Sequence, residues 1–131
     1  MKRHVDFLSW LYLAWGFIFL LVALAGGALA AGALAISTGT SPVQVSSPLA
    51  ARFTAVTLLV LAGIAMLWAA LHLWIGRALG GYTPRARLLA LGLAVVNMVL
   101  LPFGTALGAY ACWVLLKDEG RRVFHDGGQA T

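Results

Sequence analysis

Few side chains in this sequence could do chemistry, and the first of them is a histidine in an apolar run. His72 could bond a neighbouring helix, relay a proton, or supply one axial ligand to a haem or chlorin. His4 and His125 lie far away near the two ends, and the spacing of the three indicates no metal site. We expect His72 to bond a neighbouring helix, with pigment or haem binding as the alternative.

A second polar group, Asn97, lies about one helical turn before Pro102. Proline removes a backbone donor and frees a carbonyl of the preceding turn. We therefore expect Asn97 and the hydroxyl of Thr105 to satisfy these groups and stabilise a turn of the chain. A contact of Asn97 with a substrate or an ion is the alternative.

The remaining candidates indicate no reaction. Cys112 is the only cysteine, so it can form no disulfide within the chain, and we expect it to pack as a small apolar residue. Asp118 and Glu119 have no nucleophile, base or metal ligand near them in the sequence. We expect no catalytic residue, no metal and no resident cofactor, and therefore not an enzyme.

The amino-acid composition indicates whether water or a lipid bilayer surrounds the chain. The chain has 131 residues, of which 62% are hydrophobic and 10% charged, whereas a soluble domain has about 25% charged residues. A lipid bilayer must therefore cover much of the surface. The net charge of +5 lies in short clusters between charge-free stretches. Without a basic stripe or interleaved aromatic residues, this pattern excludes nucleic acid as a partner and favours membrane lipids.

The charge-free stretches predict an all-α, integral membrane four-helix bundle, since about 20 apolar residues cross a bilayer. Thr83 and Pro84 have the residue types of a helix N-cap and first helical position. Pro102 and Gly104 predict a tight hairpin between the third and fourth helices. The expected single transmembrane domain, residues 1–131, has spans at about 10–36, 53–76, 84–101 and 104–119, followed by a tail over 120–131.

The basic residues orient these spans. Four crossings leave only Arg52 outside and place eight of the nine basic residues on the cytoplasmic side, which is the usual asymmetry of membrane proteins. With three crossings, only five of the basic residues would lie on the cytoplasmic side and four would lie outside. The eight are Lys2, Arg3, Arg77, Arg85, Arg87, Lys117, Arg121 and Arg122. We expect both termini in the cytoplasm, and an uncleaved first helix, because its apolar run exceeds that of a signal peptide.

Small residues predict where helices approach closely. Gly104 and Gly108 form a G-x-x-x-G pattern that Cys112 extends down the same helix face, and Gly26 and Gly27 begin a second small-residue region in the first span. In a bilayer such residues allow backbones to pack closely. Packing within the bundle and packing against another protein both explain them.

Residues 97–116, NMVLLPFGTALGAYACWVLL, carry the motif N-x4-PFGTALG-x-Y-x2-WVLL. This string, together with the basic connector 77–87, resembles a family of small bacterial tetraspan membrane proteins whose activity is uncharacterised. The resemblance covers residues 77–124; the first half is similar only in being hydrophobic. It implies four helices in the bacterial inner membrane and implies no activity.

These observations favour a non-enzymatic accessory or scaffold subunit that packs as a homo-oligomer or against a larger membrane complex. One alternative is a small oligomeric channel or transporter in which Asn97, Thr105 and the outer loop line a path. The other is a haem- or chlorin-binding subunit that uses His72.

Overall fold

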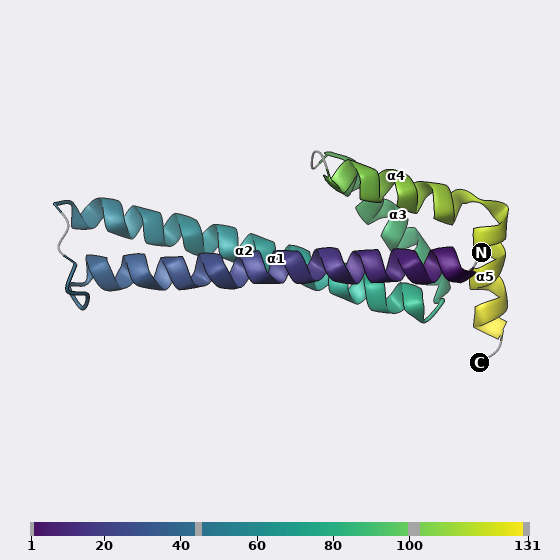
Figure 1. Cartoon of the computed structure of the whole chain (residues 1–131), viewed down its shortest axis with the longest axis horizontal. Helices are drawn as coiled ribbons and strands as arrows, with labels where there is room; N and C mark the ends of the chain where they lie inside the picture. The colour runs from purple at the N-terminus through teal and green to yellow at the C-terminus, as the bar shows by residue number, and fades with distance from the viewer. Residues whose placement is uncertain (1, 44–45, 100–102, 130–131) are drawn as a thin grey trace. The chain divides into compact units, whose positions relative to one another are not determined.

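The computed structural model describes residues 2–43, 46–99 and 103–129, and this part of the chain is all-α and contains no strand. The all-α prediction is confirmed. The helices are α1 (Lys2–Ser37), α2 (Pro48–Gly80), α3 (Pro84–Val99), α4 (Phe103–Leu116) and α5 (Asp118–Gln129) (Figure 1).

The chain packs as two compact units, and α1 and α2 contribute to both. The first unit consists of Met1–Trp15 and His72–Thr131, and the second of Gly16–Leu71. The second unit is therefore a pair of helix segments joined by the loop that follows Ser37. The first unit contains the ends of α1 and α2 together with α3, α4 and α5.

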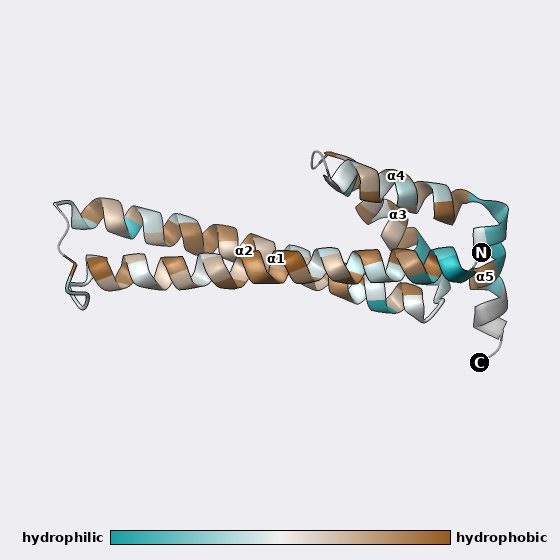
Figure 2. Ribbon diagram, viewed as in Figure 1, coloured by the Kyte–Doolittle hydropathy of each residue, from teal (hydrophilic) through white to brown (hydrophobic). Residues whose placement is uncertain are grey.

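Two helices, α1 and α2, are long and apolar enough to cross a membrane. Figure 2 shows hydrophobic residues along their length, whereas the beginning of α5 is hydrophilic. Only 11% of the most apolar 18-residue stretch of each long helix is buried inside the structure. The core helix of a soluble protein would be mostly buried, so the apolar surface of these helices needs another cover.

Polar side chains close the ends of the two long helices. Ser37 Oγ donates to the carbonyl of Leu34 over 2.8 Å at the end of α1. Ser47 Oγ accepts the amide N–H of Ala50 and caps the start of α2, whose first residue is Pro48. These bonds satisfy backbone groups that a helix end leaves without partners.

The connector between α2 and α3 differs from the prediction in one respect. Pro84 begins α3, as the sequence predicts, but the Thr83 hydroxyl does not cap that helix. It donates instead to the carbonyl of Ala78 over 2.9 Å and so closes the end of α2. Tyr82 adopts a left-handed conformation in this turn, with φ of 51°.

Helices α3 and α4 pack against each other in the first unit. The predicted hairpin turn at Pro102–Gly104 falls partly on residues 100–102, which lie outside the described residues. Gly104 itself lies in the first turn of α4 and is buried. Thr105 Oγ1 donates to the carbonyl of Met98 over 3.0 Å, which links the start of α4 to the end of α3.

The helix that corresponds to the fourth predicted span, 104–119, ends before that span does. Helix α4 stops at Leu116, and α5 begins at Asp118, so much of the predicted tail is helical. Gly120 permits this corner: a Cβ there would collide with the carbonyl of Val114. Phe124, 2% exposed, then packs α5 against the unit, with its ring 6.3 Å from that of Tyr82.

Candidate functional site: a buried cluster of tyrosine, histidine and asparagine

Three polar side chains meet inside the first unit, one from each of three helices. Tyr12 of α1, His72 of α2 and Asn97 of α3 are all fully buried, with 0% exposure. Tyr12 lies on the same face of α1 as the buried residues Val5, Leu8 and Ser9. The long helix therefore presents one packed face to α2 and α3, and the cluster forms where the three helices meet.

Direct contacts connect the three side chains. Asn97 Nδ2 lies 3.0 Å from His72 Nε2. The rings of Tyr12 and His72 stack with centroids 5.6 Å apart and an interplanar angle of 26°. Tyr12 Oη donates to the backbone carbonyl of Ala90 over 3.0 Å, so the tyrosine joins α1 to α3 while its ring covers the imidazole.

Close backbone contact between α1 and α2 supports the cluster. Ser9 Oγ donates to the carbonyl of Gly76 over 2.7 Å. A Cβ at Gly76 would lie 3.0 Å from Leu13 Cγ and 3.1 Å from the Leu13 backbone nitrogen. The absence of a side chain at Gly76 thus lets α1 approach one turn from His72.

The tautomer of His72 depends on the orientation of the Asn97 amide. If Asn97 Nδ2 donates the hydrogen bond, His72 Nε2 must accept it, and the imidazole is neutral with its proton on Nδ1. Asn97 Oδ1 is buried and has no hydrogen-bond partner among the described residues. The cluster therefore contains a buried acceptor that makes no hydrogen bond with any described residue, next to the contact between Asn97 and His72.

This arrangement opposes ligation of a haem or chlorin. An axial ligand needs an open face beside the coordinating nitrogen, but His72 is fully buried and its Nε2 contacts Asn97. The described residues also contain no group of three or more histidine, cysteine or acidic side chains that could hold a metal ion. The chemistry that the geometry supports is hydrogen bonding between helices.

No family model, curated protein or solved structure matches this chain.

The structure changes the expected partner of Asn97. The sequence suggested that Asn97 and Thr105 stabilise the turn around Pro102 together. Thr105 does bond to the end of α3, but Asn97 points to His72 of α2. The periodicity of α3 explains the difference, because the buried residues Ala86, Ala90, Leu93, Ala94 and Asn97 follow a single face.

Sequence reasoning missed Tyr12 as a member of the site. Trp10, Tyr12 and Trp15 lie near the start of the first predicted span, where aromatic residues are typical of a belt at the membrane surface. Trp10 is 72% exposed, as a belt residue would be, but Tyr12 is fully buried. The spacing of residues 5, 8, 9 and 12 would have revealed it, since these positions share a helix face.

The predicted small-residue contacts fall into two classes. A Cβ at Gly108 would lie 2.5 Å from the carbonyl oxygen of Ala94 and 2.8 Å from Met98 Cγ, so this glycine is required where α3 and α4 meet. A Cβ at Gly26 would lie 3.4 Å from that of Ala62, an ordinary contact within the second unit. One at Gly27 would meet nothing within 4 Å. Cys112 is half-buried and unpaired with any other cysteine.

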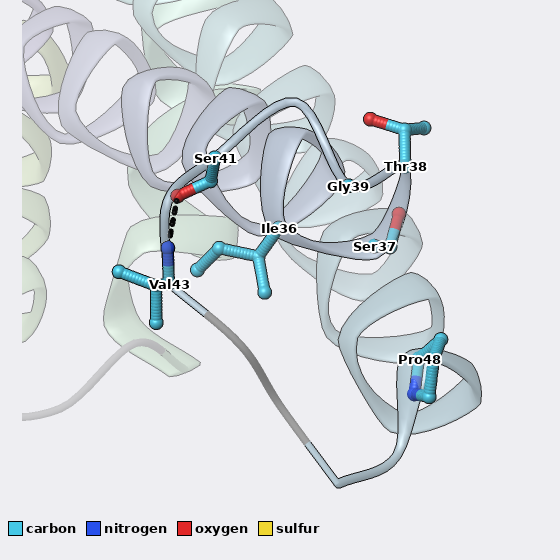
Figure 3. Close-up of a pocket in the computed structure, with 7 residues that line it drawn as sticks. All are labelled: Ile36, Ser37, Thr38, Gly39, Ser41, Val43 and Pro48. Carbon is cyan, nitrogen blue, oxygen red and sulfur yellow. Dashed lines mark hydrogen bonds between the residues drawn. The ribbon is translucent and has the colours of Figure 1, made fainter.

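A pocket of about 330 Å³ lies in the loop after α1 (Figure 3). Its hydroxyl groups are already used locally: Thr38 Oγ1 donates to the carbonyl of Leu34, and Ser41 Oγ accepts the N–H of Val43. Gly39 allows the turn with φ of 75°. These hydroxyls therefore stabilise the loop that connects α1 to α2.

Proposed function

We propose that this chain is a non-enzymatic membrane protein of four crossings, which serves as an accessory or scaffold subunit by packing against itself or a larger membrane complex. The observation that carries the proposal is the exposed apolar surface of α1 and α2. In each helix, only 11% of the most apolar 18-residue stretch is buried inside the structure.

The second unit supports placement in a bilayer. Its part of α1, from Gly16 to Ser37, is about 33 Å long, and its part of α2, from Pro48 to Leu71, is about 36 Å, against about 30 Å of hydrocarbon. Arg52 is the only charged residue in this stretch of sequence. All other charged residues belong to the first unit, which supports a cytoplasmic location for the ends of the helices there.

In the proposed topology α3 and α4 supply the third and fourth crossings. They are about 24 Å and 21 Å long, which is short for a typical bilayer. The contact of Asn97 with His72 places the end of α3 about two turns from the connector end of α2, so a third and a fourth crossing require the first unit itself to lie in a locally thin bilayer. The resemblance of residues 77–124 to small bacterial tetraspan proteins supports the same topology and a place in the inner membrane.

A groove on the second unit supports association with another helix. It has a volume of about 530 Å³, and its lining includes Gly27, Ala28, Ala62 and Gly63. A Cβ at Gly27 or Gly63 would meet nothing within 4 Å, so the packing of this unit does not itself require these glycines. Small residues on an open groove allow the backbone of a partner helix to approach closely.

The alternatives receive less support from the geometry. A channel lined by Asn97 and Thr105 needs both side chains to face a water path, but Asn97 is fully buried against His72 and Thr105 bonds to Met98. Haem ligation needs an accessible nitrogen on His72. Neither alternative is carried further.

The test compares glycine variants in a mild detergent after extraction from the native membrane. We expect wild type to purify as an oligomer or with a stoichiometric partner, and Gly27→Leu and Gly63→Leu to lose that association while still folding. Gly32→Leu is the matched control, since Gly32 also has no atom within 4 Å of a Cβ but does not line the groove. A wild-type chain that is monomeric and partner-free, even after crosslinking in the native membrane, would contradict the proposal.

A further inference from the structure

A groove in the first unit combines a cation with an apolar floor. It lies between the end of α2 and the start of α3 and has a volume of about 620 Å³. Its lining residues are Trp74, Ala78, Thr83, Pro84, Arg85, Ala86 and Leu89. Among the described residues that line it there is no carboxylate, so the charge that they bring to the groove is positive.

The groove has a polar end and an apolar end. Arg85 and Leu89 lie one turn apart on α3, and Trp74 and Ala78 lie one turn apart on α2. Arg85 is close to the start of α3, while Trp74 and Leu89 lie farther from the connector between the helices. Trp74 is 58% and Leu89 44% exposed, so the apolar end is open along its length.

Arg85 is available to a ligand, whereas its neighbour Arg87 is not. Arg87 Nε donates to the carbonyl of Leu115 over 3.0 Å and so closes the end of α4. Arg85 is exposed and makes no ion pair or hydrogen bond with any residue that the structure describes. Arg77, next to Ala78 at the same end of α2, is likewise exposed and without such a partner.

We propose that this groove binds an anionic phospholipid of the cytoplasmic leaflet, with the phosphate at Arg85 and an acyl chain along Trp74 and Leu89. The proposal rests on the membrane placement given above, and on no oligomer or partner. A guanidinium binds phosphate oxygens through a planar pair of donors. Tryptophan is favoured at the depth where the headgroups meet the hydrocarbon, and basic pockets between membrane helices on this side bind anionic headgroups.

The phosphate alone would be held weakly, because an exposed arginine in water gains little from one ion pair. The acyl chain supplies the rest through the apolar surface that it covers on Trp74 and Leu89. We therefore expect phosphatidylglycerol to bind, and glycerol phosphate, which carries a phosphate group but no acyl chains, not to compete with it.

The experiment is native mass spectrometry of the detergent-solubilised full chain, titrated with phosphatidylglycerol or phosphatidylcholine. We expect wild type to retain phosphatidylglycerol preferentially, and Arg85→Gln to weaken that binding about fivefold or more. Arg3→Gln is the control, since Arg3 is exposed but lines no part of the groove. Trp74→Ala should weaken the binding of both lipids, because it removes apolar surface that an acyl chain covers.

Equal binding of the two lipids to wild type, or equal loss in Arg85→Gln and Arg3→Gln, would overturn the proposal. Competition by glycerol phosphate would assign the site to a free anion instead. A different result would contradict the membrane placement itself. In that case alkaline carbonate would extract the chain from the membrane fraction, and the chain would stay soluble without detergent.

Discussion

The side-chain amide of Asn97 lies 3.0 Å from the Nε2 of His72, and both side chains are fully buried. The contact joins α2 to α3 across 25 positions of sequence. With the Tyr12 ring stacked on the imidazole, it makes the first unit a junction of three helices.

The first prediction concerns this pair. We expect His72→Leu and Asn97→Leu each to destabilise the fold in detergent, because each leaves a buried polar group without its partner. A double-mutant cycle should give a coupling energy of about 0.6 kcal/mol, and at most about 1.7 kcal/mol, as found for hydrogen bonds between membrane helices. Thermal unfolding of the two single variants and the double variant measures it; strictly additive losses would show that the contact does not contribute.

Much of the fold could be predicted from the sequence, because hydropathy and charge report on single segments. The apolar runs locate α1 to α4, and Pro84 marks the first residue of α3. The break at Lys117 could not be predicted, since Lys117 and Glu119 both continue a helix readily. Gly120 permits the corner, because a Cβ there would collide with the carbonyl of Val114 six residues earlier.

The candidate site could be predicted only in part, for the same reason. His72 and Asn97 stand out singly as polar residues in apolar runs. Their pairing depends on which faces of α2 and α3 meet, and short apolar helices with small residues on several sides do not specify this. Tyr12 lies between Trp10 and Trp15, and aromatic residues near the start of a span are typical of the membrane interface, so the sequence does not mark Tyr12 as buried.

The second prediction uses two glycines in the α3–α4 pair. Gly108→Ala should lower the free energy of unfolding by about 1–3 kcal/mol, because the new methyl group meets the Ala94 carbonyl oxygen and Met98 Cγ. Gly92→Ala is the matched control: a Cβ there meets nothing within 4 Å, so the variant should equal or exceed wild type in stability. The comparison is made by thermal unfolding in one detergent, and the idea fails if Gly108→Ala and Gly92→Ala melt together.

The third prediction concerns Tyr82, which lies in the connector outside the proposed spans. The hydrogen bond from its Oη to Asp6 Oδ1, 2.5 Å long, is the main cause that raises the pKa of Tyr82 to about 12, and burial adds to it. The unfolded pKa is about 10. Since the folded value is the higher one, the bond stabilises the fold fully below pH 10 and is lost as the pH rises from about 10 to 12.

Ultraviolet absorbance of tyrosinate measures this titration, with Tyr82→Phe subtracted to isolate the Tyr82 signal. We expect a midpoint near 12 in wild type and a value closer to 10 in Asp6→Ala. A wild-type midpoint that Asp6→Ala leaves unchanged would contradict the role of Asp6.

Cysteine labelling tests the central claim, four crossings with both termini cytoplasmic, most directly. Cys112→Ala removes the only native cysteine, and single cysteines are then placed at Val43 in the outer loop, Gly81 in the inner connector and Val99 at the end of α3. With a membrane-impermeant maleimide, we expect Val43→Cys and Val99→Cys to react from outside the cell, and Gly81→Cys to react only in inside-out vesicles. Labelling of Gly81→Cys from outside would contradict the orientation, and a Val99→Cys protected from both sides would contradict the third and fourth crossings.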